Sequence, residues 1–155
     1  MRAPPFLLLT ALFAVTPLFA AVTVTYGDAD KFTDAGDRNT DPRKVMQVLE
    51  NHLKALGQKL PGKDLKIEIF DLDRAGRPRM NLPTEIRVVS GKGDMPCIDL
   101  AYSLGTAPAV RERVCDPEFT RPLEFRYNEH DPLVYEKRML DQWFERRFVK
   151  GEAPR

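Results

Sequence analysis

The chain has 155 residues, a formal net charge of +1 and 30% charged residues. A net charge so close to zero gives no support to a nucleic-acid-binding role or to attachment to an anionic membrane surface. The length suits a single domain with one hydrophobic core. Apolar residues fall in periodic groups between the charges, which argues against a disordered chain.

Residues 1–20 have the pattern of a secretory signal peptide. Arg2 supplies a positive charge, residues 6–19 are mainly apolar, and Ala20–Ala21 offers small residues for cleavage. The apolar stretch is shorter than the roughly 20 residues that a membrane-spanning helix needs, and no second apolar run follows it. We therefore expect an exported protein without a membrane span.

The first half of the mature chain predicts a strand, an ordered loop and a helix. Residues 22–26 alternate β-branched and aromatic side chains, which favours a strand. Residues 27–40 are rich in Asp, Gly and Thr, and Phe32 gives this loop one apolar anchor. Asp41–Pro42 supplies an N-cap and a first-turn proline, and apolar residues then recur every three or four positions up to a stop signal at Gly57.

The second half begins with strands. Residues 65–72 alternate with period two and predict a strand, whereas glycine and prolines in residues 73–83 predict a loop. Residues 84–89 predict a short strand. Residues 95–104 and 109–115 then predict a β-hairpin.

The register of this hairpin follows from a three-residue loop at 105–107. It places Cys97 directly opposite Cys115, and most other pairs match apolar with apolar or acidic with basic side chains. Leu100 opposite Glu112 is the one poor match. Opposed strand residues lie about 4.5–5.5 Å apart at Cα, within the range of a disulfide, so we expect a Cys97–Cys115 bridge in an oxidising compartment.

The last predicted element is a helix. Residues 121–127 alternate weakly and predict either another strand or an extended arm. Asp131–Pro132 repeats the N-cap and proline signature and opens a helix with a wide apolar face. The element order indicates a single α+β domain over residues 21–150, in which two helices cover a mainly antiparallel sheet of four to five strands. Residues 151–155 are expected to form a C-terminal tail.

Three segments resemble an exported proteobacterial family of unknown function. They are Val22–Tyr26 with Asp30–Asp34, Glu68–Gly76, and Asp131–Phe144. The resemblance covers most of the mature chain and implies a periplasmic location in a Gram-negative cell. The family brings no established reaction, ligand or catalytic residue to this chain.

The loop after the first strand carries candidate binding residues, which are Phe32, Asp34, Asp37 and Arg38. Binding residues often lie in such loops. Asp and Thr side chains also fold loops by bonding to the nearby backbone, and this structural role is the alternative interpretation.

Two further candidates lie at the end of the strand over residues 65–72. Arg74, Arg77 and Arg79 crowd one loop and could bind a carboxylate, a phosphate or an acidic partner, although a solvated surface is the alternative. Asp71 and Asp73 share one face of the strand end and could hold a hard cation. Calcium prefers six to eight oxygens, so a solvated strand end is the alternative here.

The sequence offers few sets of residues that are suited to catalysis. Ser90 and Ser103 lie outside a Gly-x-Ser-x-Gly turn, and the cysteines are expected to be oxidised. His52 and His130 would need carboxylates to complete a zinc site. We therefore expect no catalytic residues and no cofactor, in a non-enzymatic module that binds an envelope protein or polymer. A small-molecule or divalent-cation site at the loop aspartates, with or without hydrolysis, is the alternative, and the oligomeric state stays open.

Overall fold

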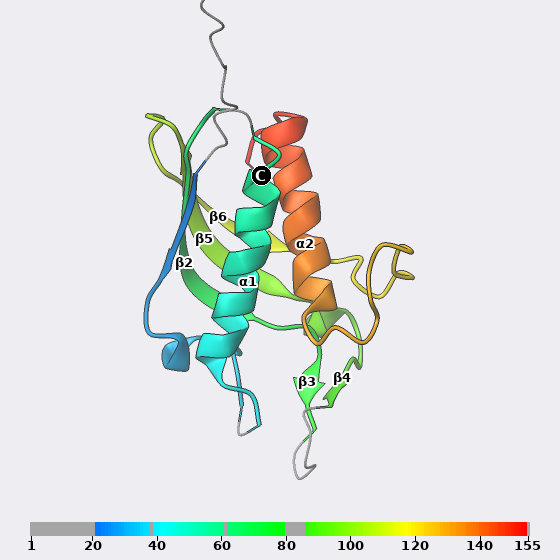
Figure 1. Cartoon of the computed structure of the whole chain (residues 1–155). Helices are drawn as coiled ribbons and strands as arrows, with labels where there is room; N and C mark the ends of the chain where they lie inside the picture. Colours follow the sequence, from blue (N-terminus) through cyan, green and yellow to red (C-terminus); the bar gives the residue numbers. More distant parts are fainter. Residues whose placement is uncertain (1–20, 38, 61, 80–85, 155) are drawn as a thin grey trace, which may run out of the picture.

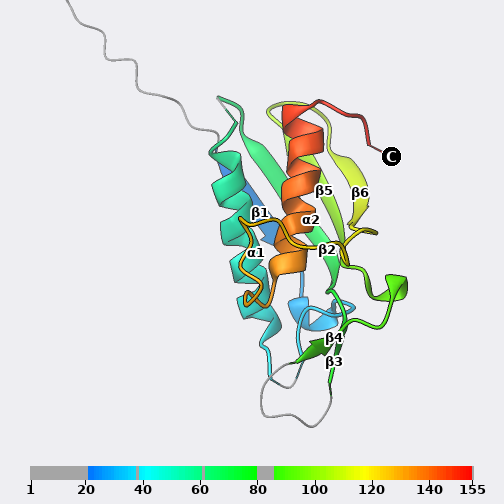
Figure 2. The same ribbon diagram turned by 90° about the vertical axis from the view of Figure 1, so that its right-hand side faces the viewer.

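The computed structural model describes residues 21–37, 39–60, 62–79 and 86–154. It has two layers, a four-stranded sheet and two helices that lie side by side on one face of the sheet (Figures 1 and 2). The helices are α1 (Pro42–Gly57) and α2 (Val134–Phe144). Within the described ranges, neither helix has the length and apolar character needed to cross a membrane. The expected signal peptide at residues 1–20 lies outside these ranges.

The main sheet mixes one parallel pair of strands with two antiparallel pairs. In spatial order its strands are β1 (Val22–Tyr26), β2 (Leu65–Asp73), β5 (Cys97–Leu104) and β6 (Val110–Cys115). β1 runs parallel to β2 because α1 forms the crossover between them, and the other neighbours are antiparallel. The predicted α+β class, with two helices on a mainly antiparallel sheet, is confirmed.

The core lies between the sheet and the helices. Along β2, Leu65, Ile67 and Ile69 are buried while Lys66 and Glu68 are exposed, so only one face of the strand is apolar. Burial of each large apolar side chain contributes about 1.5–3 kcal/mol. The helices contribute Val45, Met46, Leu49, Leu53 and Leu56 from α1 and Met139, Leu140, Trp143 and Phe144 from α2.

Helix α1 has the predicted ends. Asp41 caps it by accepting a hydrogen bond from Arg43 N at 2.9 Å, and Pro42 occupies the first turn. Gly57 is the last helical residue, but its backbone is not left-handed. A Cβ at this position would lie 1.8 Å from Cγ2 of Val22, so the glycine allows α1 to approach β1 closely.

Helix α2 begins later than the sequence predicts. Asp131 accepts a hydrogen bond from Leu133 N at 2.9 Å, and its carbonyl accepts one from Val134 N at 3.1 Å. These bonds close a turn before the helix, which therefore starts at Val134. Beyond Phe144 the chain continues as a π-helix over Glu145–Val149.

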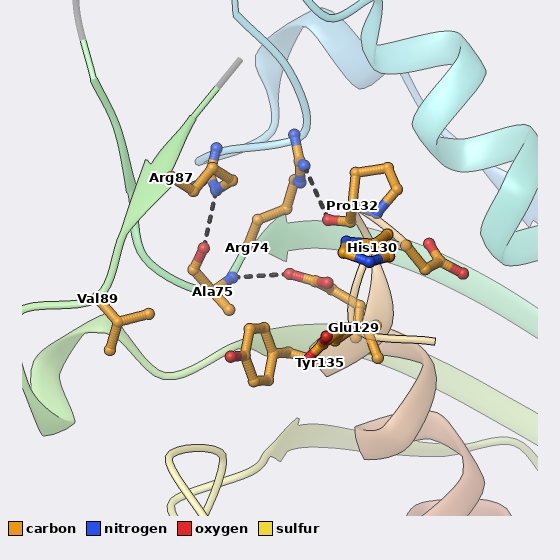
Figure 3. A pocket seen from close by; sticks show the side chains of 11 residues that line it. Arg74, Ala75, Arg87, Val89, Glu129, His130, Pro132 and Tyr135 are labelled. Carbon is orange, nitrogen blue, oxygen red and sulfur yellow. Dashed lines mark hydrogen bonds between the residues drawn. The ribbon is translucent and has the colours of Figure 1, made fainter. Parts of the chain in front are cut away.

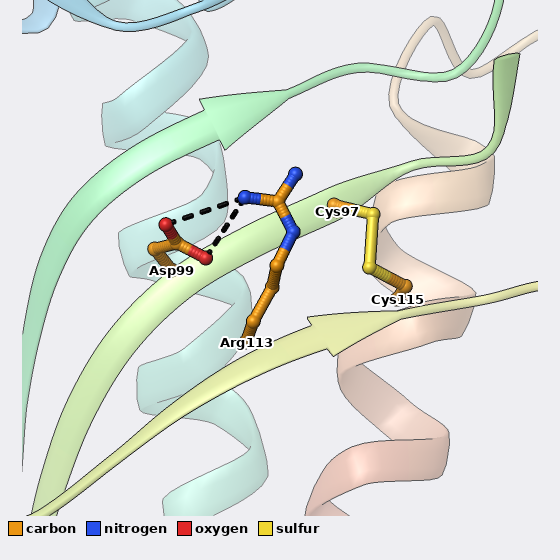
Figure 4. The surroundings of a disulfide bond; sticks show 4 residues. All are labelled: Cys97, Asp99, Arg113 and Cys115. Atoms are coloured by element: carbon orange, nitrogen blue, oxygen red, sulfur yellow. Dashed lines mark hydrogen bonds and ion pairs between the residues drawn. A yellow bond between two sulfur atoms is a disulfide. The ribbon is translucent and has the colours of Figure 1, made fainter. Parts of the chain in front are cut away.

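The hairpin has the predicted register in every pair. Cys97 faces Cys115 with a Cα–Cα distance of 4.2 Å, and their sulfur atoms lie at disulfide-bonding distance (Figure 4). On the same face of the hairpin, Arg113 Nη1 lies 3.2 Å from Asp99 Oδ1. The strands are shorter than predicted, since β5 begins at Cys97 and β6 at Val110.

The poorly matched hairpin pair has a tertiary explanation. Glu112 accepts hydrogen bonds from Trp143 Nε1 at 3.3 Å and from Arg147 Nε at 2.9 Å. Arg147 Nη2 also pairs with Glu112 Oε1, and both side chains are almost fully buried. Glu112 therefore joins β6 to the π-helix, while Leu100 opposite it packs in the core.

Three predictions for the segments between the helices need correction. The predicted loop over residues 73–83 contains β3 (Arg77–Pro78), which pairs with β4 (Arg87–Val88) in a second small sheet. In the predicted strand over residues 84–89, residues 84 and 85 lie outside the described ranges and only β4 is extended and paired. Of the two alternatives predicted for residues 121–127, the strand is not formed: residues 125–126 form a turn, with Tyr127 N bonded to Glu124 O at 3.0 Å.

Candidate functional site

A cavity of about 310 Å³ lies where β2 ends and α2 begins (Figure 3). This volume is at the lower end of the range typical of small-molecule sites. Two larger depressions flank the end of α2, but their described lining has no buried side-chain atom that lacks a hydrogen-bond partner. The smaller cavity is lined by Arg74–Ala75, Arg87, Val89, Glu129–Pro132 and Val134–Glu136.

Glu136 is the unusual residue of this cavity. Its side chain comes from the first turn of α2, and the residue is only 1% exposed. Oε1 accepts a hydrogen bond from Ala75 N at 2.7 Å, whereas Oε2 has no hydrogen-bond partner among the described residues. Burial raises the pKa of Glu136 and outweighs the hydrogen bond from Ala75 and the charge of Arg74, which act to lower the pKa.

Arg87 fixes the turn that follows β2. Its Nε donates to Ala75 O at 2.8 Å and its Nη2 donates to Gly76 O at 2.7 Å. The same guanidinium pairs with the carboxylate of Asp34 in the loop after β1. Arg87 therefore ties β4, the turn and the first loop together, and these bonds occupy much of its donor capacity.

The three arginines predicted as one basic cluster are not brought together. Arg74 is 1% exposed, and its Nη2 donates to Pro132 O at 3.4 Å (Figure 3). Arg77 extends into solvent with a side chain that is 81% exposed, and it pairs with Asp94 Oδ1 at 3.0 Å. Arg79 is also exposed. Of the three, Arg74 alone lines the cavity.

The aspartates at the end of β2 fasten the first loop. Asp71 accepts hydrogen bonds from Thr33 N at 2.6 Å and Thr33 Oγ1 at 2.7 Å, so each of its oxygens has a protein donor. Asp73 pairs with Asp34 in an isolated β-bridge, and burial together with the Asp34 charge raises the pKa of Asp73. The described residues contain no group of three or more His, Cys, Asp or Glu side chains arranged to hold a metal ion.

The predicted binding residues of the first loop also make local contacts. Phe32 is partly buried against the core, as its proposed role as an anchor requires. Asp37 accepts hydrogen bonds from Asn39 N at 2.8 Å and Thr40 N at 3.0 Å. Arg38 lies outside the described residues. These contacts favour the alternative in which the loop residues stabilise the loop itself.

The two histidines lie in different environments. His130 is exposed at the rim of the cavity. His52 Nε2 lies 2.7 Å from Asp141 Oδ1, and Tyr127 donates its hydroxyl hydrogen to Asp141 Oδ2 at 2.8 Å. Burial acts to raise the pKa of Asp141, but the hydrogen bonds from His52 and Tyr127 lower it overall. This polar cluster links α1 to α2.

Sequence reasoning missed Glu136 and Arg87 as site residues. A signal for Glu136 was available, because it falls three residues after Leu133 and four before Leu140, on the apolar stripe of the last helix. An acidic residue on a buried stripe marks a buried carboxyl group. Arg87 gave no comparable signal, since its contacts depend on how two distant loops fold.

The three segments that carry the family resemblance meet around this end of the sheet. Thr33 of the first segment bonds to Asp71 of the second, and Ala75 of the second bonds to Glu136 of the third. Residues more than 100 positions apart are thereby placed around one region of the fold, which includes the cavity.

Fold and cavity together define a two-layer α+β protein with a polar pocket at one end of its sheet. A family model described as "Protein of unknown function (DUF3016)" matches residues 20–146, which is most of the chain, and the chain belongs to this family. No curated protein and no solved structure matches the chain. The expectation of a family of unknown function is therefore confirmed.

Proposed function

We propose that this chain is an exported, non-enzymatic binding module of the cell envelope, and that its cavity binds a small polar ligand. The observation that supports this most is Oε2 of Glu136, a buried polar atom of a cavity-lining residue that lacks a hydrogen-bond partner among the described residues. Leaving such a group unsatisfied costs about 1–3 kcal/mol, and more for a charged group. A ligand that bonds to this atom would remove that cost.

The chemistry of the lining favours binding over nucleophilic catalysis. No Ser, Thr or Cys occurs among the described residues that line the cavity. A carboxyl group with a raised pKa could act as a general acid, but it would need a reacting group beside it. Glu136 is therefore proposed as a ligand-binding residue.

Export is supported by two independent features. Residues 1–20 have a signal-peptide pattern, and Cys97 and Cys115 lie at disulfide-bonding distance, an arrangement that suits an oxidising compartment. In a Gram-negative host we expect the protein in the periplasmic fraction with Ala21 as its first residue, as determined by N-terminal sequencing. A cytoplasmic chain that retains residues 1–20 would contradict export.

A cavity-blocking variant tests the binding function. Val89 lines the cavity and is 37% exposed, so Val89→Trp can fill the mouth without disturbing the core. Val48, which is 39% exposed on α1, is not a lining residue, and Val48→Trp is the matched control.

The measurement is native mass spectrometry of protein purified from the periplasm without reductant. We expect a bound small molecule on the wild type and on Val48→Trp, with occupancy reduced at least tenfold on Val89→Trp. Equal occupancy on the wild type and both variants would place the ligand elsewhere, and a bare chain in all three proteins would contradict the proposed function.

A protein or polymer partner is the second candidate function, and Phe125 favours it. This side chain is fully exposed, next to Arg126, whose guanidinium lies 4.8 Å from the ring centroid of Tyr127. Aromatic and arginine side chains are enriched at binding hot spots. A photo-crosslinking residue at position 125 should yield a defined adduct in the periplasm, while one at Val149, which is 56% exposed, should not. The absence of an adduct at position 125 would count against this surface.

A further inference from the structure

We propose that the ligand of the cavity carries a cationic nitrogen, as an ammonium or guanidinium group, that donates a hydrogen bond to Oε2 of Glu136. This inference rests on the proposed binding function and adds the chemical class of the ligand. Glu136 lines the cavity, its Oε2 is a buried acceptor without a donor among the described residues, and Arg87 beside it is bonded to protein acceptors.

The geometry of Glu136 leaves one acceptor for a ligand. The backbone N–H of Ala75 is used by Oε1, at 2.7 Å. Oε2 is buried, with less than 1 Å² of accessible surface. It has no hydrogen-bond partner among the described residues, so it is cut off from most solvent without a protein donor in exchange. An ionised carboxylate accepts hydrogen bonds only, and a buried one is stabilised most strongly by a positively charged donor.

The cavity offers less to an anionic ligand. Arg87 donates to two backbone carbonyls and pairs with Asp34. Arg74 donates to the carbonyl of Pro132. The Arg87 contacts restrain that guanidinium by protein acceptors, so an anion would have to compete with those acceptors for its donors. At Arg74 the bond to Pro132 uses Nη2, and Nε is a buried donor with no hydrogen-bond acceptor among the described residues.

The rest of the lining suits a cation. Glu129 adds a carboxylate at the exposed rim. Tyr135 also lines the cavity, but its ring already has the guanidinium of Arg138 5.7 Å from its centroid and an edge contact with Phe119. Asp131 also lines the cavity, but Lys137 Nζ lies 2.5 Å from its Oδ2 and partly neutralises it.

Proton exchange should accompany binding of such a ligand. Burial raises the pKa of Glu136, and a cation beside the carboxylate would lower that pKa again. Between the two pKa values, binding therefore releases a proton and affinity increases with pH. The other charged or titratable groups of the lining are Arg74, Arg87, Glu129, His130, Asp131 and Tyr135.

Isothermal titration calorimetry on the oxidised mature protein tests the ligand class. The probes are n-butylammonium and n-butylguanidinium, with 1-butanol and butyrate as neutral and anionic controls of similar size. We expect saturable binding of both cations at millimolar concentration, stronger binding at higher pH, and a binding enthalpy whose dependence on the buffer reports proton release. The two controls should give no saturable heat.

Three variants locate the effect. Glu136→Gln retains an acceptor for Ala75 N but cannot ionise, and it should lower the affinity for n-butylammonium at least tenfold. Glu129→Gln at the rim should lower the affinity for n-butylammonium less than threefold. His130→Gln should leave the pH dependence of that affinity unchanged. Thermal melts of each variant verify folding before the titration.

The outcomes separate this inference from the proposed function. If n-butylammonium does not bind, or binds equally well to Glu136→Gln, the cationic class is overturned. Binding of butyrate or 1-butanol in its place also overturns the class but leaves the cavity as a binding site. The proposed function itself depends on the comparison of Val89→Trp with Val48→Trp.

Discussion

At the scale of single residues, buried charged side chains in this fold fall into two kinds. Arg138 and Asp116, which are 4% and 3% exposed, bond to each other at 2.9 Å, and Arg138 also donates to the carbonyls of Glu118 and Arg121. Glu136 is buried to the same degree, but among the described residues only one of its oxygens is bonded. The first arrangement is self-sufficient, whereas the second leaves an acceptor for another molecule.

The titration of Glu136 gives a prediction about stability. Its pKa is raised by burial above the ordinary value of 4.5, so the folded state binds this proton more tightly than the unfolded chain does. The stabilisation is complete below about pH 4.5 and is lost as pH rises through the raised pKa. In urea unfolding without ligand, the wild type should therefore lose stability relative to Glu136→Gln as pH increases. Parallel stability curves for the two proteins would contradict the raised pKa.

Asp141 should behave in the opposite way. Its pKa is lowered below the ordinary value of 3.8, because the bonds from His52 and Tyr127 outweigh the effect of burial. Its stabilisation is therefore present at neutral pH and is lost as pH falls below about 3.8 through the lowered pKa. Asp141→Asn should lower the free energy of unfolding at pH 7 by about 1–3 kcal/mol, measured by urea denaturation. An unchanged midpoint would show that this cluster does not stabilise the α1–α2 contact.

At the scale of elements, the β5–β6 hairpin and the end of α2 stabilise each other. The hairpin register places the two cysteines in one pair and directs Glu112 toward the helix layer. The π-helix then supplies Arg147 to that carboxylate. Local strand pairing and tertiary packing therefore agree in this region.

Loss of the cysteine bridge should reduce stability without abolishing the fold. The cysteines are 18 positions apart, and a loop of that size corresponds to about 3 kcal/mol in the loop-entropy model. Reduction, or the double change Cys97→Ala with Cys115→Ala, should lower the free energy of unfolding by about that amount in urea. Equal masses before and after reduction, with both thiols open to alkylation in protein purified without reductant, would refute the bridge.

Removal of the Glu112 charge should be costly. Glu112→Gln leaves the nearly buried guanidinium of Arg147 without its carboxylate, and loss of one member of such a pair costs about 3–5 kcal/mol. Glu118→Gln is the control, because Glu118 pairs with Arg121 at the surface, and it should change stability by less than about 1 kcal/mol. Similar thermal midpoints for the two variants would show that the buried pair contributes little.

The elements that local patterns specify could be predicted, and those that depend on tertiary contacts could not. The hairpin register and both ends of α1 follow from turn length, caps and periodicity. The pairing of β3 with β4 and the role of Glu112 depend on residues that meet only after folding. The candidate site is of the second kind, because Glu136 reaches Ala75 across 61 positions.

At the scale of the whole molecule, the sheet and helices bring three distant segments to one end of the fold. The loop after β1 bonds to the end of β2, and the turn after β2 bonds to the start of α2. The cavity lies at the second of these junctions, where the small β3–β4 sheet extends from the main body (Figure 1). Residues on a rigid sheet and helix can keep a binding site in shape without an occupant.

Carboxyl ¹³C NMR of Glu136 tests the central claim most directly. The δ-carbon of Glu136 is followed through a pH titration of the oxidised mature protein, with and without saturating n-butylammonium. We predict a pKa above the ordinary value of 4.5 in the free protein and a lower pKa when the cation is present. A pKa near 4.5 that does not respond to the cation would contradict the account of Glu136 as a buried acceptor for a cationic ligand.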